Sequence, residues 1–249
     1  MAQRALTIDG LRKAYGGKTV LDGVSFEVPA GQMVGIVGRS GAGKSTLLRC
    51  INRLVEADAG AIGWDGLDVR ALRGGALLDW RARCGMIFQQ FQLVDRMDAL
   101  TNVLLGSVRR RRTLPLLFRV FPAADRAKAL ELLQQLDLGP QAGQTVKTLS
   151  GGQQQRVAIA KVLMQGVEVL LADEPVSSLD PENTRIVMDQ LRQLQRSGGV
   201  TVLCNLHNLE VARSYCDRVL GLSQGRLVFD GSPQELTAGR EESIYAGAR

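Results

Sequence analysis

The chain has 249 residues, a length that suits one large domain or a main domain with a smaller lobe. Hydrophobic residues make up 45% of the chain and charged residues 22%, which excludes a wholly disordered protein. The 31 basic and 25 acidic residues give a formal net charge of +6. A mildly basic protein can bind nucleic acid, anionic lipid or phosphate ligands, or can simply carry a solvated surface.

The cysteines and the apolar runs bear on the compartment of the protein. No two cysteines form a CxxC pair and no histidine cluster accompanies them, so we expect no zinc site and free thiols in a reducing cytosol, at Cys50, Cys84, Cys204 and Cys216. The first residues lack the apolar stretch of a signal peptide, and no apolar run approaches the roughly 18 residues that span a bilayer. We therefore expect a protein that does not cross a membrane by itself.

Apolar runs and amphipathic stretches alternate along the chain. In the first half they predict strands at Ala5–Asp9, Val24–Val28 and Met33–Val37, a helix at Lys44–Arg53, a strand at Arg83–Phe88, and helices at Leu100–Val108 and Asp125–Leu136. In the second half they predict a helix at Gln153–Gln165, a strand at Val167–Ala172, a helix at Glu182–Arg196, a strand at Val200–Asn205, a helix at Leu209–Tyr215, and a hairpin of Arg218–Leu222 with Arg226–Phe229.

This order of elements predicts the fold class. Strands that alternate with helices favour an α/β core with a parallel sheet. The two early strands have no helix between them and predict an added antiparallel layer. The helix-rich segment from Ala99 to Gly143 is expected to form a separate lobe.

A glycine-rich loop follows the third predicted strand. The nine residues are Gly38, Arg39, Ser40, Gly41, Ala42, Gly43, Lys44, Ser45 and Thr46, of which the first eight fit the pattern GxxxxGK[ST]. Glycines let backbone N–H groups approach phosphate oxygens, and the following helix adds the positive end of its dipole. Lys44 is expected to reach the β- and γ-phosphates and Ser45 to ligate Mg²⁺. The alternative is an ordinary glycine-rich turn.

Two later segments carry further polar groups. The predicted strand that ends at Ala172 is followed by Asp173 and Glu174, which it would deliver to the ligand-binding edge of the sheet. Asp173 suits the Mg²⁺ shell and Glu174 suits a water that attacks the γ-phosphate. Ser150, Gly151, Gly152 and Gln153 precede a helix, where they suit either an anion site or a plain serine N-cap.

Taken in order, these motifs resemble those of the ATP-binding cassette ATPases. The resemblance covers about residues 4 to 236 and includes the Leu-Ser-Gly-Gly-Gln signature, the Ser178-Leu179-Asp180 segment and His207. It implies a P-loop NTPase fold of the α/β class, with a mixed sheet core, an antiparallel β layer and a helical subdomain. It also implies one domain over 1–249. The RecA-like core with the antiparallel layer would occupy about 1–98 and 144–236, the helical subdomain about 99–165, and a C-terminal tail 237–249.

The resemblance also implies roles for single residues. Tyr15 matches the aromatic residue that stacks on adenine, and Gln89 matches the glutamine that senses Mg²⁺ and the attacking water, although its neighbour Gln90 is an alternative. The serine at 150 and the residues up to Gln153 match the signature that binds the γ-phosphate on the partner subunit. Asp180 matches the loop that crosses the dimer interface, and His207 matches the switch histidine at the γ-phosphate.

A closer resemblance is to the ATPases of phosphonate importers. It rests on 47–52, 85–96 and 149–160, and on the insert Arg109–Phe121; Lys161 departs from the usual arginine. It implies ATP and Mg²⁺ as cofactors, and a homodimer on the cytoplasmic face of the inner membrane with two permease subunits. A periplasmic or lipid-anchored solute-binding protein would act indirectly, and no nucleic acid is expected. Phosphate esters, phosphite or a polar amino acid remain alternative solutes, and a soluble ATPase acting on nucleic acid or ribosomes is an alternative of another class.

The insert contains a run of four arginines, Arg109–Arg112, followed by apolar residues. Such a run is either a solvated turn or a surface that meets the permease and lipid head groups.

Overall fold

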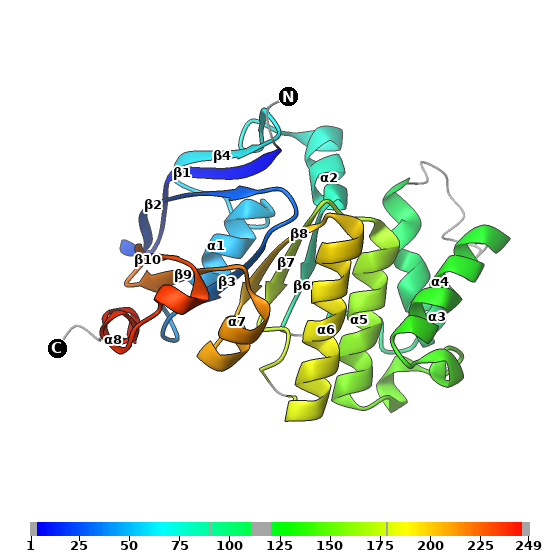
Figure 1. The fold of residues 1–249 in the computed structure, drawn as a ribbon. Helices are drawn as coiled ribbons and strands as arrows, with labels where there is room; N and C mark the ends of the chain where they lie inside the picture. Colours follow the sequence, from blue (N-terminus) through cyan, green and yellow to red (C-terminus); the bar gives the residue numbers. More distant parts are fainter. Residues whose placement is uncertain (1–3, 90, 111–120, 178, 246–249) are drawn as a thin grey trace.

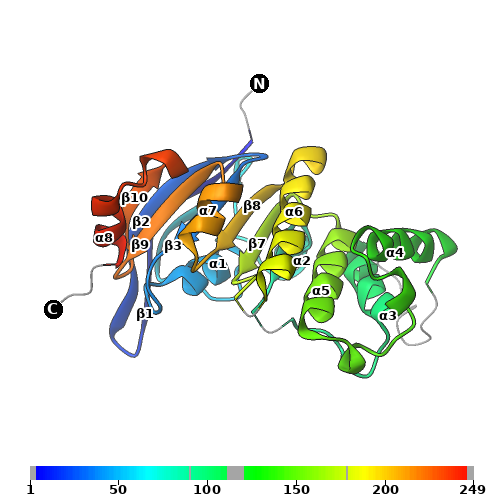
Figure 2. The same ribbon diagram turned by 60° about the horizontal axis from the view of Figure 1, so that its bottom comes forward.

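A computed structural model describes residues 4–89, 91–110, 121–177 and 179–245. Two β-sheets and a group of helices make up the described part of the chain (Figures 1 and 2). None of the helices in these ranges is long and apolar enough to cross a membrane. Arg111 and Arg112 lie outside the described residues, and so do Gln90 and Ser178.

The larger sheet has six strands in the order β10-β9-β3-β8-β7-β6. Five of them run parallel: β9 (Arg218–Ser223), β3 (Met33–Val37), β8 (Thr201–Asn205), β7 (Val169–Asp173) and β6 (Cys84–Ile87). The edge strand β10 (Arg226–Gly231) pairs antiparallel with β9. Every residue of β3, β6, β7 and β8 is buried, as expected for central strands with both faces covered.

The smaller sheet is antiparallel, in the order β2-β1-β4-β5. Its strands are β1 (Ala5–Tyr15), β2 (Lys18–Pro29), β4 (Ala59–Trp64) and β5 (Leu67–Asp68). Helix α1 (Lys44–Ile51) lies between the two sheets (Figure 1). Its apolar residues share one core cluster with residues of β1, β2 and β3, so the phosphate loop leads into a helix that is packed on two sides.

Helices cover the other face of the larger sheet. Around α5 (Gly151–Gln165) and α6 (Pro181–Gly198) a second core cluster joins the sheet to α3 (Ala99–Leu104) and α4 (Ala123–Gln135). Figure 2 shows α3, α4 and α5 grouped at one end of the molecule. Shorter 3-10 turns connect them, namely η1 (Leu105–Arg110), η3 (Gly139–Gln141) and η4 (Val146–Thr148).

The sequence-based elements are confirmed in type, except that the helix predicted at Leu100–Val108 is α-helical only to Leu104 and continues as the 3-10 turn η1. The structure adds several elements that the sequence did not indicate. The added ones are β4, β5, α2 (Gly74–Arg83), η3, η4, η5 (Pro233–Glu235) and α8 (Ala238–Tyr245). Helix α1 ends at Ile51 rather than at Arg53, because Asn52 and Arg53 leave the helix and Arg53 takes a positive φ of 60°. The expected antiparallel layer is present, with β1 and β2 longer than predicted. The last predicted helix, α7, spans Leu209–Tyr215 as expected.

Candidate functional site

Three neighbouring strands position the residues of the candidate site at their carboxyl ends. In the sheet, β8 lies between β3 and β7, and all three are parallel. Their carboxyl ends therefore meet at one edge, where ligands bind in open α/β sheets. The phosphate loop follows β3, Asp173 ends β7, and Asn205 ends β8 directly beside Asp173 in the register.

The phosphate loop requires glycine at two positions. Gly38 has φ of 148°, and a Cβ there would lie 2.1 Å from the carbonyl oxygen of Leu222. Gly43, the N-cap of α1, has φ of 103°, and its Cβ would lie 2.7 Å from the carbonyl oxygen of Val20. Because any side chain would clash with backbone atoms, the β2 and β9 segments hold the loop closely from both sides.

Lys44 is buried and bonded to its own loop. Its Nζ donates to the carbonyl oxygen of Gly38 at 2.6 Å and to that of Arg39 at 3.1 Å. Burial lowers the pKa of Lys44 from its usual value, and the nearby carboxylates of Glu174 and Asp173 oppose that shift. The structure thus holds a cation at the loop in a place where phosphate oxygens could replace the two carbonyls as acceptors.

Ser45, Asp173 and Asn205 form one polar cluster. The Ser45 hydroxyl donates to Oδ1 of Asp173 at 2.7 Å, and Nδ2 of Asn205 donates to the same oxygen at 2.7 Å. The other carboxylate oxygen of Asp173 lies 3.6 Å from a guanidinium nitrogen of Arg49. Asp173 is 2% exposed, so this cluster fixes a carboxylate beside the first turn of α1.

Glu174 and His207 meet directly. Nε2 of His207 lies 2.6 Å from Oε1 of Glu174. An ionised carboxylate can only accept, so Nε2 carries the hydrogen in this arrangement. The Glu174 side chain is 16% exposed and that of His207 is 44% exposed, which leaves the pair at the mouth of the site.

One hollow of about 160 Å³ brings most of the predicted phosphate-site residues together. It is lined by Val20, Ser40, Gly41, Gly43, Lys44, Ser45, Thr46, Glu174 and His207. A larger hollow of about 540 Å³ lies on the other side of Glu174 and His207, between α6 and α7. Gly38, Arg39 and Ala42 do not line the smaller hollow, since the first two face Lys44 with their carbonyls and Ala42 is buried.

Ser150 and Gln153 form a closed capping box at the start of α5. The Ser150 hydroxyl accepts from the Gln153 amide at 3.3 Å, and Oε1 of Gln153 accepts from the Ser150 amide at 2.9 Å. The N-cap interpretation of this segment is therefore confirmed. It is compatible with an anion site, because the N-terminus of a helix favours negative charge. These residues, with Gly151 and Gly152, are not among those that line the phosphate-loop hollow.

Asp180 caps the next helix. Its carboxylate accepts from the Asn183 amide at 2.9 Å and from Nδ2 of Asn183 at 2.6 Å, and these bonds lower the pKa of Asp180. The side chain of Asn183 also reaches Gly152, where an added Cβ would lie 3.1 Å from Oδ1. Within one chain the segment around Asp180 therefore lies against the signature.

Tyr15 and Gln89 lie outside the hollow. The Tyr15 ring is 48% exposed at the end of β1, with Nζ of Lys13 at 5.2 Å from its centroid. Gln89 is exposed just beyond the end of β6. Neither residue is among those that line the 160 Å³ hollow, so their expected roles at adenine and Mg²⁺ stay predictions.

Sequence reasoning missed Asn205, Arg49 and Val20. The sequence identifies Asn205 only as the end of a strand, because its place in the site depends on β8 lying between β3 and β7. The spacing of Arg49 does carry a signal, because Arg49 lies one helical turn beyond Ser45 on α1 and therefore on the same face of the helix. Val20 comes from β2, and no sequence signal links it to the phosphate loop.

The oxygen groups fit Mg²⁺ in company with a nucleotide. Among the described residues no group of three or more His, Cys, Asp and Glu could hold a metal ion alone. Mg²⁺ usually keeps waters and takes one or two protein oxygens plus substrate phosphates. Ser45 and Asp173 supply such oxygens, and Oδ1 of the neighbouring Asn205 is buried without a hydrogen-bond partner in the described structure.

Comparisons with known proteins identify the family. A family model described as ABC transporter matches residues 21–177. The chain is 54% identical over 240 residues to the phosphonates import ATP-binding protein PhnC 2 of Rhodopseudomonas palustris (strain BisB18), covering 96% of this chain and 89% of that protein. With the same coverage it is 53% identical to the phosphonates import ATP-binding protein PhnC of Bradyrhizobium diazoefficiens.

A solved structure has the same fold. The dimeric ATP-binding cassette MJ0796, in a post-hydrolysis state bound to ADP and Pi, aligns with a TM-score of 0.82 and 31% identity, over 92% of this chain and 98% of that chain. The family model spans more than half of this chain, and the two relatives match nearly all of it. These findings show that the chain belongs to the ABC transporter family.

Proposed function

We propose that this chain is the ATP-hydrolysing subunit of a phosphonate importer. One observation supports this most directly. Lys44 and Ser45 of the phosphate loop face Glu174 and His207 across a single hollow, with Asp173 bonded to Ser45. Such an arrangement puts a phosphate-binding cation, two metal-binding oxygens and a base near one another.

Each group has a distinct task in phosphoryl transfer to water. Lys44 and the N-terminus of α1 bind phosphate oxygens, so the buried ammonium exchanges backbone carbonyls for phosphate. Glu174 orients the attacking water and takes its proton. His207 would turn its Nε2 hydrogen from Glu174 to the transferred phosphoryl group, which frees the Glu174 carboxylate for the water. Mg²⁺, held by Ser45 and Asp173, would neutralise phosphate charge.

Phosphonate as the solute is supported by the names of the relatives. Two relatives that are 54% and 53% identical are phosphonates import ATP-binding proteins, and they match along most of their own length. Phosphate esters, phosphite and polar amino acids are the competing solutes. The recognition of the solute is assigned to the permease and to a binding protein outside the membrane, so this chain supplies the energy for transport.

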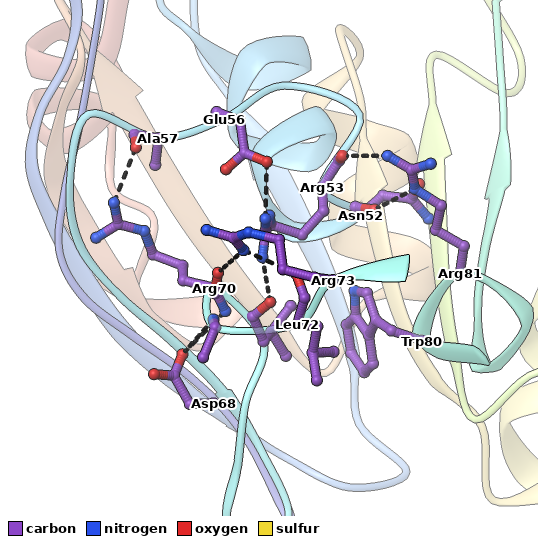
Figure 3. A network of polar contacts seen from close by, with 12 residues as sticks. Asn52, Arg53, Glu56, Ala57, Asp68, Arg70, Leu72, Arg73, Trp80 and Arg81 are labelled. Atoms are coloured by element: carbon purple, nitrogen blue, oxygen red, sulfur yellow. Dashed lines mark hydrogen bonds and ion pairs between the residues drawn. The ribbon is translucent and has the colours of Figure 1, made fainter. Parts of the chain in front are cut away.

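The permease subunits would dock where α1 ends. Trp80 Nε1 donates to the carbonyl of Ile51 at 3.0 Å, and the guanidinium of Arg81 donates to the carbonyls of Asn52 and Arg53. Figure 3 shows the Arg81 contacts with Asn52 and Arg53. A groove of about 200 Å³ lies beside them, lined in part by Leu54, Phe88, Phe91 and Lys161.

This groove supports a coupling route through α1. The phosphate loop begins α1, Trp80 binds the last carbonyl of the helix at Ile51, and Arg81 binds the carbonyls of the two residues that follow it, so a shift of α1 reaches both sites. The chain would then sit peripherally on the cytoplasmic face of the inner membrane. Residues 99–165 would form the helical subdomain that moves with the permease.

Growth on defined phosphorus sources tests the proposed function. In cells that lack this gene, we expect the wild-type chain to restore growth on methylphosphonate as the sole phosphorus source. The Glu174→Gln variant should not restore it, and both strains should grow equally on inorganic phosphate. Loss of growth on phosphite or a phosphate ester instead would assign a different solute, and wild-type purified chain without ATPase activity would contradict the catalytic assignment.

A further inference from the structure

Asn205 occupies the centre of the ligand-binding edge without a role in the mechanism above. It ends β8, and in the register it stands beside Asp173 of β7, while β3 and the phosphate loop lie on its other side. The side chain is fully buried, at 0% exposed. Asparagine is rarely buried unless its polar atoms are bonded.

The amide nitrogen of Asn205 is shared between two oxygens. Nδ2 lies 2.7 Å from Oδ1 of Asp173 and 3.4 Å from the hydroxyl oxygen of Ser45. The reverse orientation of the amide would put its oxygen 2.7 Å from a carboxylate oxygen, where two acceptors repel. The orientation of the side chain is therefore fixed by Asp173.

The amide oxygen of Asn205 has no hydrogen-bond partner among the described residues and is shielded from solvent. A buried acceptor without a partner is costly, so a native structure that keeps one commonly supplies the partner from water or a ligand. The same side chain contacts Asp173 and Ser45 through its nitrogen, and both are candidate Mg²⁺ groups.

We propose that Asn205 is a positioning residue for the bound metal ion. Its nitrogen holds the Asp173 and Ser45 oxygens in the arrangement that receives Mg²⁺. The proposal rests on the proposed function, because it needs a metal–nucleotide complex at this loop.

A purely structural role makes a different prediction. If Asn205 only fills space at the end of β8, its replacement should weaken folding and nucleotide binding together. If it positions the metal groups, its replacement should weaken metal binding selectively, because partners of metal-binding carboxylates typically change metal affinity by about 10- to 100-fold. The two roles separate when metal and nucleotide are titrated independently.

The experiment uses the full chain and Mn²⁺ as the probe. AMP-PNP, which is not hydrolysed at the γ-position, is bound to the wild type, Asn205→Leu, Asn205→Ser and Asn102→Leu. Free Mn²⁺ is counted by its EPR signal during titration, and AMP-PNP affinity is measured separately with EDTA present. Asn102 is the matched control, because it is a fully buried asparagine in α3 whose hydrogen bonds go to Val94 and Asp98.

We expect Asn205→Leu to bind Mn²⁺ at least about tenfold more weakly in the AMP-PNP complex, with metal-free AMP-PNP affinity within about twofold of wild type. Asn205→Ser keeps a hydroxyl donor, so its Mn²⁺ affinity should lie between that of Asn205→Leu and that of the wild type. Asn102→Leu should leave the Mn²⁺ affinity unchanged even where it lowers the melting temperature.

Two results would overturn the proposal. One is an Asn205→Leu variant that binds Mn²⁺ as the wild type does. The other is an equal loss of Mn²⁺ and metal-free AMP-PNP affinity, which marks a structural role. A wild-type chain that binds no AMP-PNP at all would instead contradict the proposed function, so the two failures are distinguishable.

Discussion

Glu174 holds an uncommon backbone conformation at the residue where chemistry is expected. Its φ is 55°, a left-handed value that costs a side-chain-bearing residue free energy. Asp173, directly before it, is part of the regular β7 strand. The chain thus turns sharply after the strand, and the turn aims the Glu174 carboxylate at His207, with 2.6 Å between Oε1 and Nε2. Strain of this kind persists where the surrounding structure enforces it, commonly at functional sites.

Replacing His207 by alanine should slow ATP hydrolysis more than it weakens ATP binding. The variant loses the partner of Glu174 and the donor to the phosphoryl group, while Lys44 and the loop amides remain. One preorganised donor contributes about 2–4 kcal/mol to the transition state, which corresponds to about 30- to 1,000-fold in turnover. Steady-state phosphate release and nucleotide affinity measure the two effects separately.

A double-mutant comparison tests whether the pair acts as a unit. Because Glu174 and His207 touch, adding Glu174→Gln to His207→Ala should cost little beyond either change alone. Additive losses, or near-wild-type turnover of His207→Ala within the assembled transporter, would contradict this assignment.

The polar residues that sequence reasoning found are those that a local pattern specifies. Lys44 and Ser45 sit at fixed spacings in one loop, and Asp173 and Glu174 end one apolar strand, so neither inference needs the order of strands in the sheet. Asn205 and Val20 enter the site only because β8 and β2 are neighbours of β3 and the loop. Their contribution depends on topology, which no spacing encodes.

At the scale of elements, the difference between local patterns and topology also explains why the sequence did not predict helix α2 and strand β4. Helix α2 buries only Trp80, its N-cap Arg73 makes no side-chain cap, and it starts with two glycines, so periodicity and capping signals are both weak. Strand β4 contains Gly60 and Gly63, which are typical turn residues. Pairing with β1 decides their conformation instead: a Cβ on Gly60 would lie 2.5 Å from the carbonyl oxygen of Asp9.

The docking of η1 on α5 should be sensitive to one methyl group. A Cβ at Gly106 would lie 2.1 Å from the backbone carbonyl oxygen of Lys161, which cannot move without distorting α5. Gly106→Ala should therefore lower the free energy of unfolding by about 1–3 kcal/mol. The matched control is Gly143→Ala in the same helical region, because nothing lies within 4 Å of its Cβ position.

Urea denaturation followed by circular dichroism measures both variants. A lower midpoint for Gly106→Ala, with Gly143→Ala close to the wild type, is the expected result. Equal midpoints for all three proteins would show that η1 does not pack on α5 as described.

Glu168 links the two sheets and should make their contact sensitive to acid. Its carboxylate accepts from Nε and a second nitrogen of Arg83 at 2.8 and 2.9 Å, and from Nε1 of Trp64 in β4 at 3.0 Å. The hydrogen bond from Arg83 holds the pKa of Glu168 below its usual value of 4.5, against the opposing effect of burial. The unfolded chain therefore binds this proton more readily than the folded chain.

The sign of the pH effect follows from that shift. The stability that Glu168 contributes is fully present above its unfolded pKa of 4.5 and is lost as the pH falls through the lower pKa of the folded state. Glu168→Gln should cost about 1 kcal/mol near neutral pH and should show less loss of stability below pH of about 4. Parallel acid-dependent curves for wild type and variant would exclude this contribution.

At the scale of the whole molecule, the two anion sites predicted from the sequence lie at separate places in one chain. Lys44 and Ser45 line the phosphate-loop hollow, whereas Ser150 and Gln153 cap α5 and do not line it. Both are helix N-termini, which favour negative charge. Two copies related by a two-fold axis would place each signature over the other copy's phosphate loop and create two equal nucleotide sites.

The dimer prediction follows from the chemistry of Glu174. If nucleotide joins two copies and hydrolysis separates them, a variant that binds Mg-ATP without cleaving it should accumulate as a dimer, because a ligand that binds the associated state more tightly than the monomer shifts the equilibrium toward the dimer. Glu174→Gln keeps the shape of the side chain and removes the carboxylate. Light scattering should therefore show dimers of this variant with Mg-ATP and monomers with ADP.

A second change, Ser150→Arg, would place a bulky cation at the cap of α5 and should abolish the dimer while each chain still binds nucleotide at its own phosphate loop. A Glu174→Gln chain that stays monomeric in Mg-ATP and hydrolyses it at the wild-type rate would show that neither the sandwich nor the role of Glu174 is as proposed.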